Sequence, residues 1–457
     1  MTSGGYSTGF WRIKRGSSRI GLRVSPRRLV RSKRMTSESG IFVIIYLLTL
    51  LLVATEMVPM SVAALIGALL TIWFGLSYNI FSYNDMASLI DLKVIGLLLG
   101  TMIVLEVTYR SGIFHLIALY TIKLSRGDPR LLFAITSFTA AGVSMLLSDS
   151  TALLMMAAAV ITISRVMEYD PTPYFISAAI MINLGGTSTL IGSVSNMIIG
   201  VESGLGFTEF IKYLTPCEFA LWVLTLLTLY FLYRPRLGEK KPVPEFNPWE
   251  NVRDMRFFTY SALLLVIFIG LFLIHESLNI GPEVIALGCA VLALAVSGID
   301  PSEVFRSLDW ETIFFLSGFF FIVGGLEETG LLLQLSQGIF NIAGGNILLA
   351  VVLTLWLSGL VSAIVSNIAV ALTFVPVIKG VHSFNPVALW SALVLGTNLG
   401  GAATPMSGIV CVMALNALKR EGVDVSFADF TKVGGLTTLV QLGFSTLYVI
   451  LRFGLVG

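Results

Sequence analysis

Apolar runs long enough to cross a lipid bilayer recur along the whole sequence, and they restrict what this chain can fold into. The runs cover residues 41–56, 59–76, 94–108, 174–200, 217–233, 257–274, 282–298, 312–326, 386–415 and 433–453. The 457 residues are 56% hydrophobic and 12% charged, with a mean hydropathy of +0.88, whereas a soluble domain carries about 25% charged residues. Lipid offers no partner to an open strand edge, so such runs form helices. The sequence therefore predicts an all-α polytopic protein of the cell membrane, with the lipid bilayer as a partner.

The N-terminal tail is strongly basic. Residues 1–34 contain ten Lys or Arg and no Asp or Glu, while the rest of the chain has a net charge of −8. We interpret residues 1–38 as a basic tail that touches anionic lipid, or else translation starts at Met35 rather than Met1. No nucleic-acid partner is expected, because the remainder of the chain has no feature that supports one. The first apolar run is not a cleavable signal peptide, since a second spanning run follows almost at once.

The sequence contains no motif for a cofactor, a metal or a catalytic group. Cys217, Cys289 and Cys411 are scattered in or beside apolar runs, and no CxxC or Cys/His cluster is present. P-loop, GxSxG and HExxH patterns are also missing. An enzyme, an ATP-driven pump and a resident cofactor or metal are therefore not expected.

A polar segment at residues 234–256 divides the sequence almost in half, and the two halves carry matching residues. "FTEFIK" at 207–212 pairs with "FADFTK" at 427–432. At an offset of 218 residues, the matched pairs are Asp91 and Asp309, Gly100 and Gly318, Gly112 and Gly330, Gly127 and Gly345, Thr136 and Thr354, Ser144 and Ser362, and Ser148 and Ser366. We therefore expect one membrane repeat over residues 39–233 and a second over 257–457, joined by this linker.

Each half predicts about five transmembrane helices and a pair of apolar arms. The arms meet at "LLSDST" in the first half and at "IVSNIA" in the second. Polar residues at the turn favour a re-entrant hairpin with a tip buried in protein over two full spans. Five spans is an odd number, so the second half enters the membrane from the opposite side, and inverted repeats are typical of secondary transporters. If residues 94–122 form two spans instead of one, the repeats are parallel.

The same four residues, Asn-Leu-Gly-Gly, interrupt one apolar run in each half, at 183–186 and at 398–401. Gly-Gly weakens a helix by roughly 1 kcal/mol per residue, so we expect a broken helix whose freed carbonyls suit a cation such as Na⁺. Close helix packing through small residues is the alternative. The candidate ion-binding residues are Asn183, Gly185, Gly186, Thr187, Thr189 and Asn196 at the first break, and Asn398, Gly400, Gly401 and Thr404 at the second.

The turns between the apolar arms supply a second set of candidate ligands. They are Ser148, Asp149 and Ser150 in the first half, and Ser366 and Asn367 in the second. An ionisable residue at membrane depth is a functional candidate by default, although Asp149 could instead cap the second arm. Asn367 offers the same cap without a titratable proton. We expect Na⁺ or H⁺ to act as the coupling ion at these tips and breaks.

Two stretches of the first half resemble a known family. "LLSDSTALLMMAAAVITI" followed by "INLGGTSTLIGSVSNMIIG" resembles the ArsB/NhaD-type permeases of the ion transporter superfamily, which also includes citrate and dicarboxylate carriers and relatives of the melanosomal P-protein. The resemblance spans roughly residues 41–457. It implies an inverted-repeat transporter, often dimeric, whose hairpin tips and breaks line the substrate and ion sites. "GSVSN" lacks the family's prolines, the second break has no equivalent of Asn196, and Asp149 is nearer the acidic tips of the Na⁺/H⁺ exchanger relatives.

These features predict an ion-coupled secondary active transporter of a small inorganic ion, working by Na⁺/H⁺ exchange or by efflux of arsenite or another anion. The alternative within the class is a Na⁺- or H⁺-coupled transporter of a di- or tricarboxylate such as citrate. Outside the class, a passive ion channel lacks substrate counterflow, and an enzyme needs catalytic groups beyond one buried Asp. We expect a small inorganic or organic ion as substrate and, from the resemblance, a homodimer.

Overall fold

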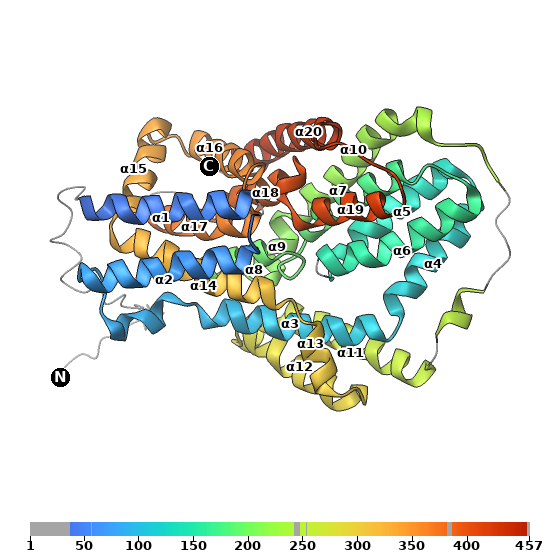
Figure 1. The fold of residues 1–457 in the computed structure, drawn as a ribbon, viewed down its shortest axis with the longest axis horizontal. Coiled ribbons are helices and arrows are strands. Elements are labelled where there is room, and N and C mark those ends of the chain that lie inside the picture. The colour runs from blue at the N-terminus through green and yellow to red at the C-terminus, as the bar shows by residue number, and fades with distance from the viewer. Residues whose placement is uncertain are drawn as a thin grey trace, which may run out of the picture. The chain divides into compact units, whose positions relative to one another are not determined.

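The computed structural model describes residues 37–457 apart from residues 56, 148, 242–246, 253, 382–385 and 455–457. Within these residues every regular element is a helix (Figure 1), which confirms the predicted all-α class. Seven of the helices are long and apolar enough to cross a membrane, and several shorter ones are apolar as well. Residues 1–36, which contain most of the basic tail and the alternative start at Met35, lie outside the described residues, and the first helix begins at Ser37.

The helices of the first half follow one another through short connections. In chain order they are α1 (Ser37–Ala54), α2 (Met60–Ser77), η1 (Tyr83–Leu89), α3 (Leu92–Arg110), α4 (Ile113–Ser125), α5 (Pro129–Ser144), α6 (Asp149–Met167), α7 (Thr172–Gly186), α8 (Val194–Ser203), α9 (Phe207–Tyr213) and α10 (Thr215–Tyr233). Two 3₁₀ turns follow in the polar linker, η2 (Arg234–Arg236) and η3 (Pro248–Asn251).

The helices of the second half repeat this order. They are α11 (Met255–Leu278), α12 (Pro282–Ser297), α13 (Pro301–Ser307), α14 (Trp310–Glu328), α15 (Leu331–Ala343), α16 (Ile347–Ser362), α17 (Asn367–Lys379), α18 (Pro386–Gly400), η4 (Pro405–Ser407), α19 (Ile409–Arg420) and α20 (Phe427–Gly454). From α3 to α8, each helix of the first half has a counterpart of similar place and order from α14 to α19.

The counterpart helices also begin in the same way. Asp91 caps α3 and Asp309 caps α14, and each side chain accepts a hydrogen bond from a backbone N–H of the first turn. Asp128 caps α5, and Asn346 takes the same place at α16. A cap of this kind stabilises a helix by about 1 kcal/mol. The local sequence therefore fixes where equivalent helices start in both halves.

The stretch expected to be one span or two is divided by a glycine in each half. Gly112 lies between α3 and α4 with φ +86°, and Gly330 lies between α14 and α15 with φ +78°. Left-handed backbone of this kind favours glycine. α4 and α15 have 13 residues each, which is too short to cross a hydrocarbon core of about 30 Å at 1.5 Å per residue. Their length therefore favours one span rather than two over residues 94–122, while the number of spans in each half stays a prediction.

Helices of the two halves pack against each other. α2 packs along α14 of the other half, and α12 packs along α3. At the crossings, a Cβ added to Gly100 would overlap the backbone of Ala286, and a Cβ added to Gly318 would overlap the backbone of Ala64. Small residues let membrane helices approach this closely. The matched glycines at positions 100 and 318 are therefore contact points between the halves.

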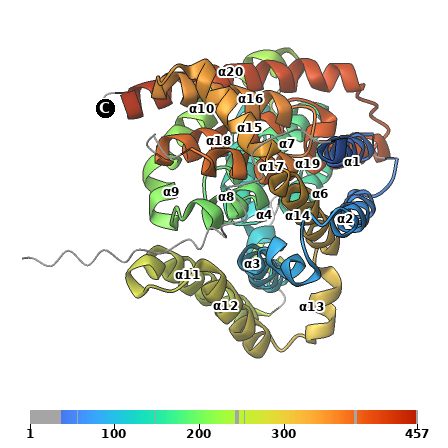
Figure 2. The same cartoon turned by 90° about the vertical axis from the view of Figure 1, so that its left-hand side faces the viewer.

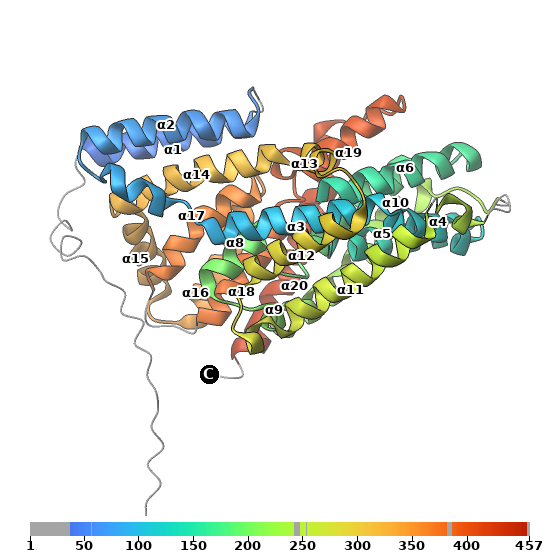
Figure 3. The same ribbon diagram turned by 90° about the horizontal axis from the view of Figure 1, so that it is seen from below.

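The two hairpins lie toward opposite ends of the structure. Figures 1 and 3 both place α5 and α6 toward one end of the long axis and α16 and α17 toward the other. Figure 2 looks along that axis and shows α10 and α20 on one side of the broken helices, with α3, α11 and α12 on the other. Inverted repeats require such opposite placement of the hairpins. The orientation of each half across the membrane stays a prediction.

Cysteines introduced at Lys123 and Asn341 test the inverted arrangement. Both residues are exposed near the ends of α4 and α15, at equivalent places. We expect Lys123→Cys and Asn341→Cys to react with an impermeant maleimide from opposite sides of oriented vesicles, in a background in which the three buried cysteines are replaced. Permeabilised vesicles, in which both react, are the control. Reaction of both variants from the same side would establish parallel repeats instead.

Candidate functional site

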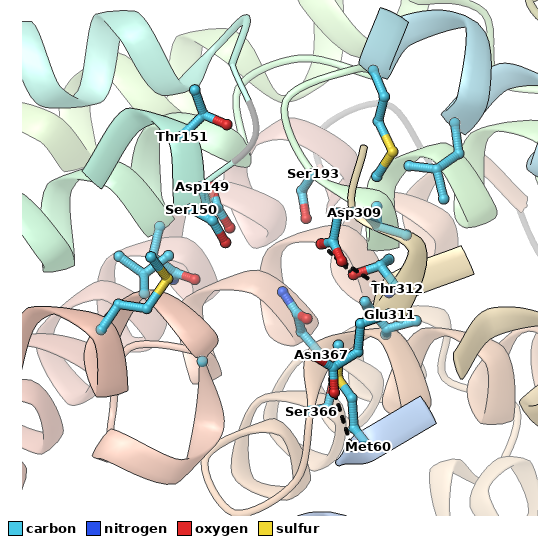
Figure 4. Close-up of a pocket in the computed structure, with 18 of the residues that line it drawn as sticks. Met60, Asp149, Ser150, Thr151, Ser193, Asp309, Glu311, Thr312, Ser366 and Asn367 are labelled. Atoms are coloured by element: carbon cyan, nitrogen blue, oxygen red, sulfur yellow. Dashed lines mark hydrogen bonds between the residues drawn. The ribbon is translucent and has the colours of Figure 1, made fainter. Parts of the chain in front are cut away.

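The tips of both hairpins meet at one cavity. Its volume is about 800 Å³, and its lining includes Asp149 and Ser150 at the start of α6 and Ser366 and Asn367 at the start of α17. Figure 4 shows these two pairs facing the same space from different helices. Four of the five residues predicted at the tips are therefore brought together, and the fifth, Ser148, lies outside the described residues.

Asp149 is held between its own hairpin and the first broken helix. Its Oδ1 accepts a hydrogen bond of 3.0 Å from the Oγ of Ser144, the last residue of α5. A Cβ added to Gly186 would lie 3.0 Å from the same oxygen. α6 begins at Asp149, so this residue belongs to the first turn of the helix, and its half-buried side chain lines the cavity.

α7 continues through both glycines of the first pair, whereas α18 ends at the first glycine of the second pair, and the backbone unwinds after each helix. α7 ends at Gly186 and α8 begins at Val194, while α18 ends at Gly400 and α19 begins at Ile409. The expectation of a broken helix in each half is therefore met. The unwound segments are 187–193, directly after the first glycine pair, and 401–408, which begins at the second glycine of the second pair.

The two glycines of each pair have different neighbours. A Cβ added to Gly185 would overlap the backbone of Ala141 on α5, and one added to Gly400 would overlap the backbone of Gly359 on α16. These two positions permit close helix packing, and neither lines the cavity. The first glycine of each pair therefore faces the neighbouring arm in this structure, and the assignment of these two glycines as ion ligands stays a prediction. Gly401 faces the centre, where an added Cβ would lie 3.0 Å from Oδ1 of Asn183.

Three asparagine side chains connect the two broken helices. The Nδ2 of Asn183 donates to the backbone oxygen of Asn398 at 2.6 Å. The Nδ2 of Asn398 donates in turn to Oδ1 of Asn196 at 2.7 Å. All three residues are buried, and a buried amide is costly without partners. We call Asn183, Asn196 and Asn398 the amide network.

The amide network also caps the C-terminal end of α7. The Nδ2 of Asn196 lies within hydrogen-bond distance of three backbone oxygens, those of Gly186 at 3.0 Å, Thr187 at 3.2 Å and Thr189 at 2.7 Å. We expected these freed carbonyls to coordinate a cation. In the structure these carbonyls lie around the amide of Asn196, and their role as cation ligands stays a prediction beside that of the side-chain oxygens at the cavity.

Two threonines attach the unwound segments to the hairpins. The Oγ1 of Thr189 donates to the backbone oxygen of Met145 at 2.6 Å, and the Oγ1 of Thr404 donates to that of Ala363 at 2.8 Å. The Oγ1 of Thr187 donates within its own helix to Asn183 O at 3.1 Å. These hydroxyls therefore hold the breaks in place, and none of the three residues lines the cavity.

Cys411 is a residue of the site that the sequence comparison missed. It stands 215 residues after Asn196, the same offset that relates the two Asn-Leu-Gly-Gly segments. Its Sγ lies 3.9 Å from the backbone oxygen of Gly401, the counterpart of the Gly186 oxygen bound by Asn196. Extending the offset of 215 residues past the two glycine pairs would have matched Cys411 with Asn196. The second break therefore has a weak donor where the first has an amide.

Acidic residues at the start of α14 form the other wall of the cavity, and they were also missed. Asp309 accepts from the N–H and the Oγ1 of Thr312 at 3.1 and 2.7 Å, and Glu311 accepts from the N–H of Met60 at 3.1 Å. Figure 4 shows Asp309 and Glu311 across the cavity from Asp149. The repeat match of Asp91 with Asp309 indicated a helix start, but not that one of the two faces a cavity.

The cavity is rich in carboxylates. Asp149, Asp309, Glu311 and Glu106 all line it, while none of its lining residues in the described part of the chain is Lys, Arg or His. Glu106 is paired with Arg110, whose Nε lies 2.7 Å from Oε1. The lining therefore favours a cation or an uncharged species, and a multiply charged anion would have to bring cations with it.

These features define the class of the protein. The described residues form an all-helical fold with helices long and apolar enough to span a membrane, and with hairpin tips that meet beside the broken helices at a cavity containing several carboxylates. Such an arrangement is that of a membrane transporter. The model of the citrate transporter family, CitMHS, matches residues 50–396, and the chain belongs to that family.

Relatives and solved structures agree with this assignment. The 46 kDa membrane protein of Mycobacterium leprae is 30% identical over 427 residues, which cover 91% of this chain and 99% of that protein. The arsenical pump membrane protein of Escherichia coli is 28% identical over 422 residues, covering 87% and 95%. The solved YdaH transporter of Alcanivorax borkumensis has a TM-score of 0.62 at 17% identity, covering 92% of this chain and 99% of that one, which shows a shared fold. The resemblance to ArsB-type permeases is thereby confirmed.

Gly185→Ala and Gly400→Ala test the packing role of the first glycine in each pair. The added methyl groups overlap backbone of α5 and α16, so we expect each to lower the free energy of unfolding by about 1–3 kcal/mol. Gly142→Ala on α5 is the matched control, since its Cβ meets nothing within 4 Å, and better helix propensity predicts no loss. Thermal melting in detergent compares them. Normal stability of the first two variants would return these glycines to a role at the ion site.

Asn196→Ala and Cys411→Ala compare the caps of the two breaks. Loss of Asn196 removes the donor shared by three buried carbonyls, so we expect a cost of about 1–3 kcal/mol. Loss of Cys411 removes one thiol contact of 3.9 Å and should cost clearly less. Unfolding of the two variants in mixed micelles gives both values. Equal costs would show that the asymmetry between the breaks has no energetic consequence.

Proposed function

We propose that this protein is an ion-coupled secondary active transporter of the cell membrane that moves a small inorganic ion, by Na⁺/H⁺ exchange or by efflux of arsenite or another small anion. The observation that carries the proposal is the meeting of Asp149 and Asn367, one tip from each half, at a carboxylate-rich cavity. The coupling ion is Na⁺ or H⁺, and the cycle uses no resident cofactor.

The chemistry of Asp149 supports coupling to a cation. A carboxylate at membrane depth is costly unless it holds a proton or lies next to a cation. Proton and Na⁺ therefore compete for the same group, and this competition is the basis of exchange. Ser150 and Asn367 add neutral oxygens on the cavity wall, as hard cations require. Asn367 can coordinate an ion but has no proton to exchange, so the first tip carries the coupling.

The placement of the cavity supports movement of the tips during transport. One wall comes from α2, α3 and α14, which link the two halves, and the other comes from the hairpins and broken helices. Inverted-repeat transporters alternate access by moving one such group against the other around a central site. We propose that the hairpins and broken helices form the moving group here.

A citrate-like tricarboxylate is the second candidate substrate, because the family model that matches this chain is described as a citrate transporter. Three carboxylates line the cavity without a basic partner among the described ion pairs. A tricarboxylate therefore needs accompanying cations to bind. Its uptake would then depend on the cation concentration as steeply as on the concentration of the tricarboxylate.

Transport by proteoliposomes under imposed gradients tests the proposal. Wild type and Asp149→Asn are compared under Na⁺ and H⁺ gradients, with Na⁺ itself, arsenite and citrate as the transported species. We expect gradient-driven transport of one inorganic ion, reduced about tenfold or more by Asp149→Asn, the effect of losing about 1.4 kcal/mol or more of cation binding. Asp424→Asn, an exposed loop residue, is the control and should behave as wild type.

The same experiment separates the alternatives. If only citrate is transported in response to a gradient, the substrate is a tricarboxylate and not an inorganic ion. A flux that responds to neither gradient would indicate a passive channel. Identical dependence on Na⁺ and pH for wild type and Asp149→Asn would remove Asp149 from the coupling mechanism.

A further inference from the structure

A second acidic side chain is buried away from the cavity, on α10. Glu218 is fully buried, and neither of its carboxyl oxygens has a hydrogen-bond partner among the described residues. It does not line the cavity that contains Asp149. A permanently ionised carboxylate in such a place has neither a cation nor a donor to stabilise it. Glu218 therefore belongs to a second place in the molecule, separate from the cavity at Asp149.

Two hydrogen bonds locate Glu218 between the first break and the last helix. The Oγ1 of Thr215 donates to the backbone oxygen of Ser188 at 3.0 Å, in the unwound segment after α7. Two to three turns further along α10, the Oγ1 of Thr225 accepts from Nε2 of Gln441 on α20 at 2.9 Å. Glu218 lies between these contacts on the same buried face of α10.

Three neighbouring residues also have unused polar atoms. The Oγ of Ser188, the Nε1 of Trp222 and the Oε1 of Gln441 are all buried and have no partner among the described residues. Trp222 follows Glu218 by one helical turn, and Ser188 and Gln441 make the two contacts that bracket it. Buried polar groups are normally hydrogen-bonded, and groups that lack direct partners are commonly bridged by water. Donors and acceptors are both present in this set.

We propose that Ser188, Glu218, Trp222 and Gln441 form an internal proton-binding site in which Glu218 exchanges its proton with water during the working cycle. None of these side chains is a direct partner of the carboxyl oxygens, so water bridges them to Glu218. The protonated acid donates its O–H to this water. On release, the carboxyl O–H bond breaks, the proton leaves on water, and the carboxylate accepts from the water that the Ser188, Trp222 and Gln441 side chains hold.

The other titratable groups on the elements around α10 do not pair with Glu218. Tyr448 on α20 donates to the backbone oxygen of Tyr213 at 2.8 Å, and Arg452 and Lys212 lie 5.3 and 5.2 Å from the Tyr213 ring centre. The remaining groups are Cys217, which contacts Ser445, Glu209 on α9, and those toward the ends of the packed helices, namely Arg130, Tyr174, Tyr230, Tyr233, Arg234, Arg236, Asp429 and Lys432.

The position of this site links the protonation state of Glu218 to the first broken helix. Ser188 belongs to the unwound segment that also contains Thr187 and Thr189, and this segment is attached to the first hairpin. A change of charge at Glu218 therefore acts on the same segment that adjoins Asp149. The inference goes beyond the proposed function, and it does not depend on which ion is transported.

Infrared difference spectroscopy of the full chain in lipid measures the proton directly. We expect a carbonyl band of a protonated carboxylic acid that is lost as pH rises and shifts in D₂O. Glu218→Gln should remove this band, because the amide has no titratable proton, while Asp149→Asn should leave it in place. Glu218→Asp keeps an acid at the site and should move the band rather than abolish it, which covers the case in which the Gln variant folds poorly.

Two results would overturn the proton site. If no acid band is lost in Glu218→Gln or moved in Glu218→Asp, Glu218 is permanently ionised. If the band is present but constant across the whole pH range in which the protein stays folded, Glu218 never exchanges its proton. Loss of transport in Asp149→Asn with an unchanged Glu218 band separates this result from the test of the proposed function.

Discussion

The hydrogen bonds of Asn398 are the interaction on which the rest of the site depends. Its backbone oxygen binds Asn183 at 2.6 Å and its side chain binds Asn196 at 2.7 Å, so one residue of the second break joins both sides of the first. In a buried setting these amides have no alternative partner in lipid or water. They therefore fix the distance between the two breaks. The hairpins, attached to the breaks by Thr189 and Thr404, are brought to one cavity as a consequence.

The repeated Asn-Leu-Gly-Gly segment predicted where the centre of the molecule lies, because glycine and asparagine are costly in a lipid-buried helix without a special reason. The direction of each side chain was not predictable from spacing alone. Gly185 and Gly186 are neighbours in sequence, yet one faces the backbone of α5 and the other faces Asp149. Asp309 was recognised as a repeat match, but its place on the cavity wall depends on how α14 packs against α2.

The two halves share a backbone plan and differ in chemistry. Asp149 in the first tip corresponds to the neutral Asn367, and the amide of Asn196 corresponds to the weaker thiol of Cys411. Glu218, the other buried carboxyl described here, also lies in the first half. The ionisable tip and the stronger cap therefore belong to the first repeat, while the second repeat contributes a neutral tip together with the carboxylates of Asp309 and Glu311 on the cavity wall. An asymmetric pair of this kind lets one half respond to a cation and the other complete the cavity.

The coupling energy between Asn196 and Asn398 tests this account most directly. A double-mutant cycle compares the free energies of unfolding of wild type, Asn196→Ala, Asn398→Ala and the double variant in mixed micelles. If their bond joins the two breaks, the losses are not additive, and the coupling should be about 0.5–1.7 kcal/mol, the range found for hydrogen bonds between membrane helices. Additive losses, with a coupling below about 0.3 kcal/mol, would contradict the view that the amide network holds the two halves together.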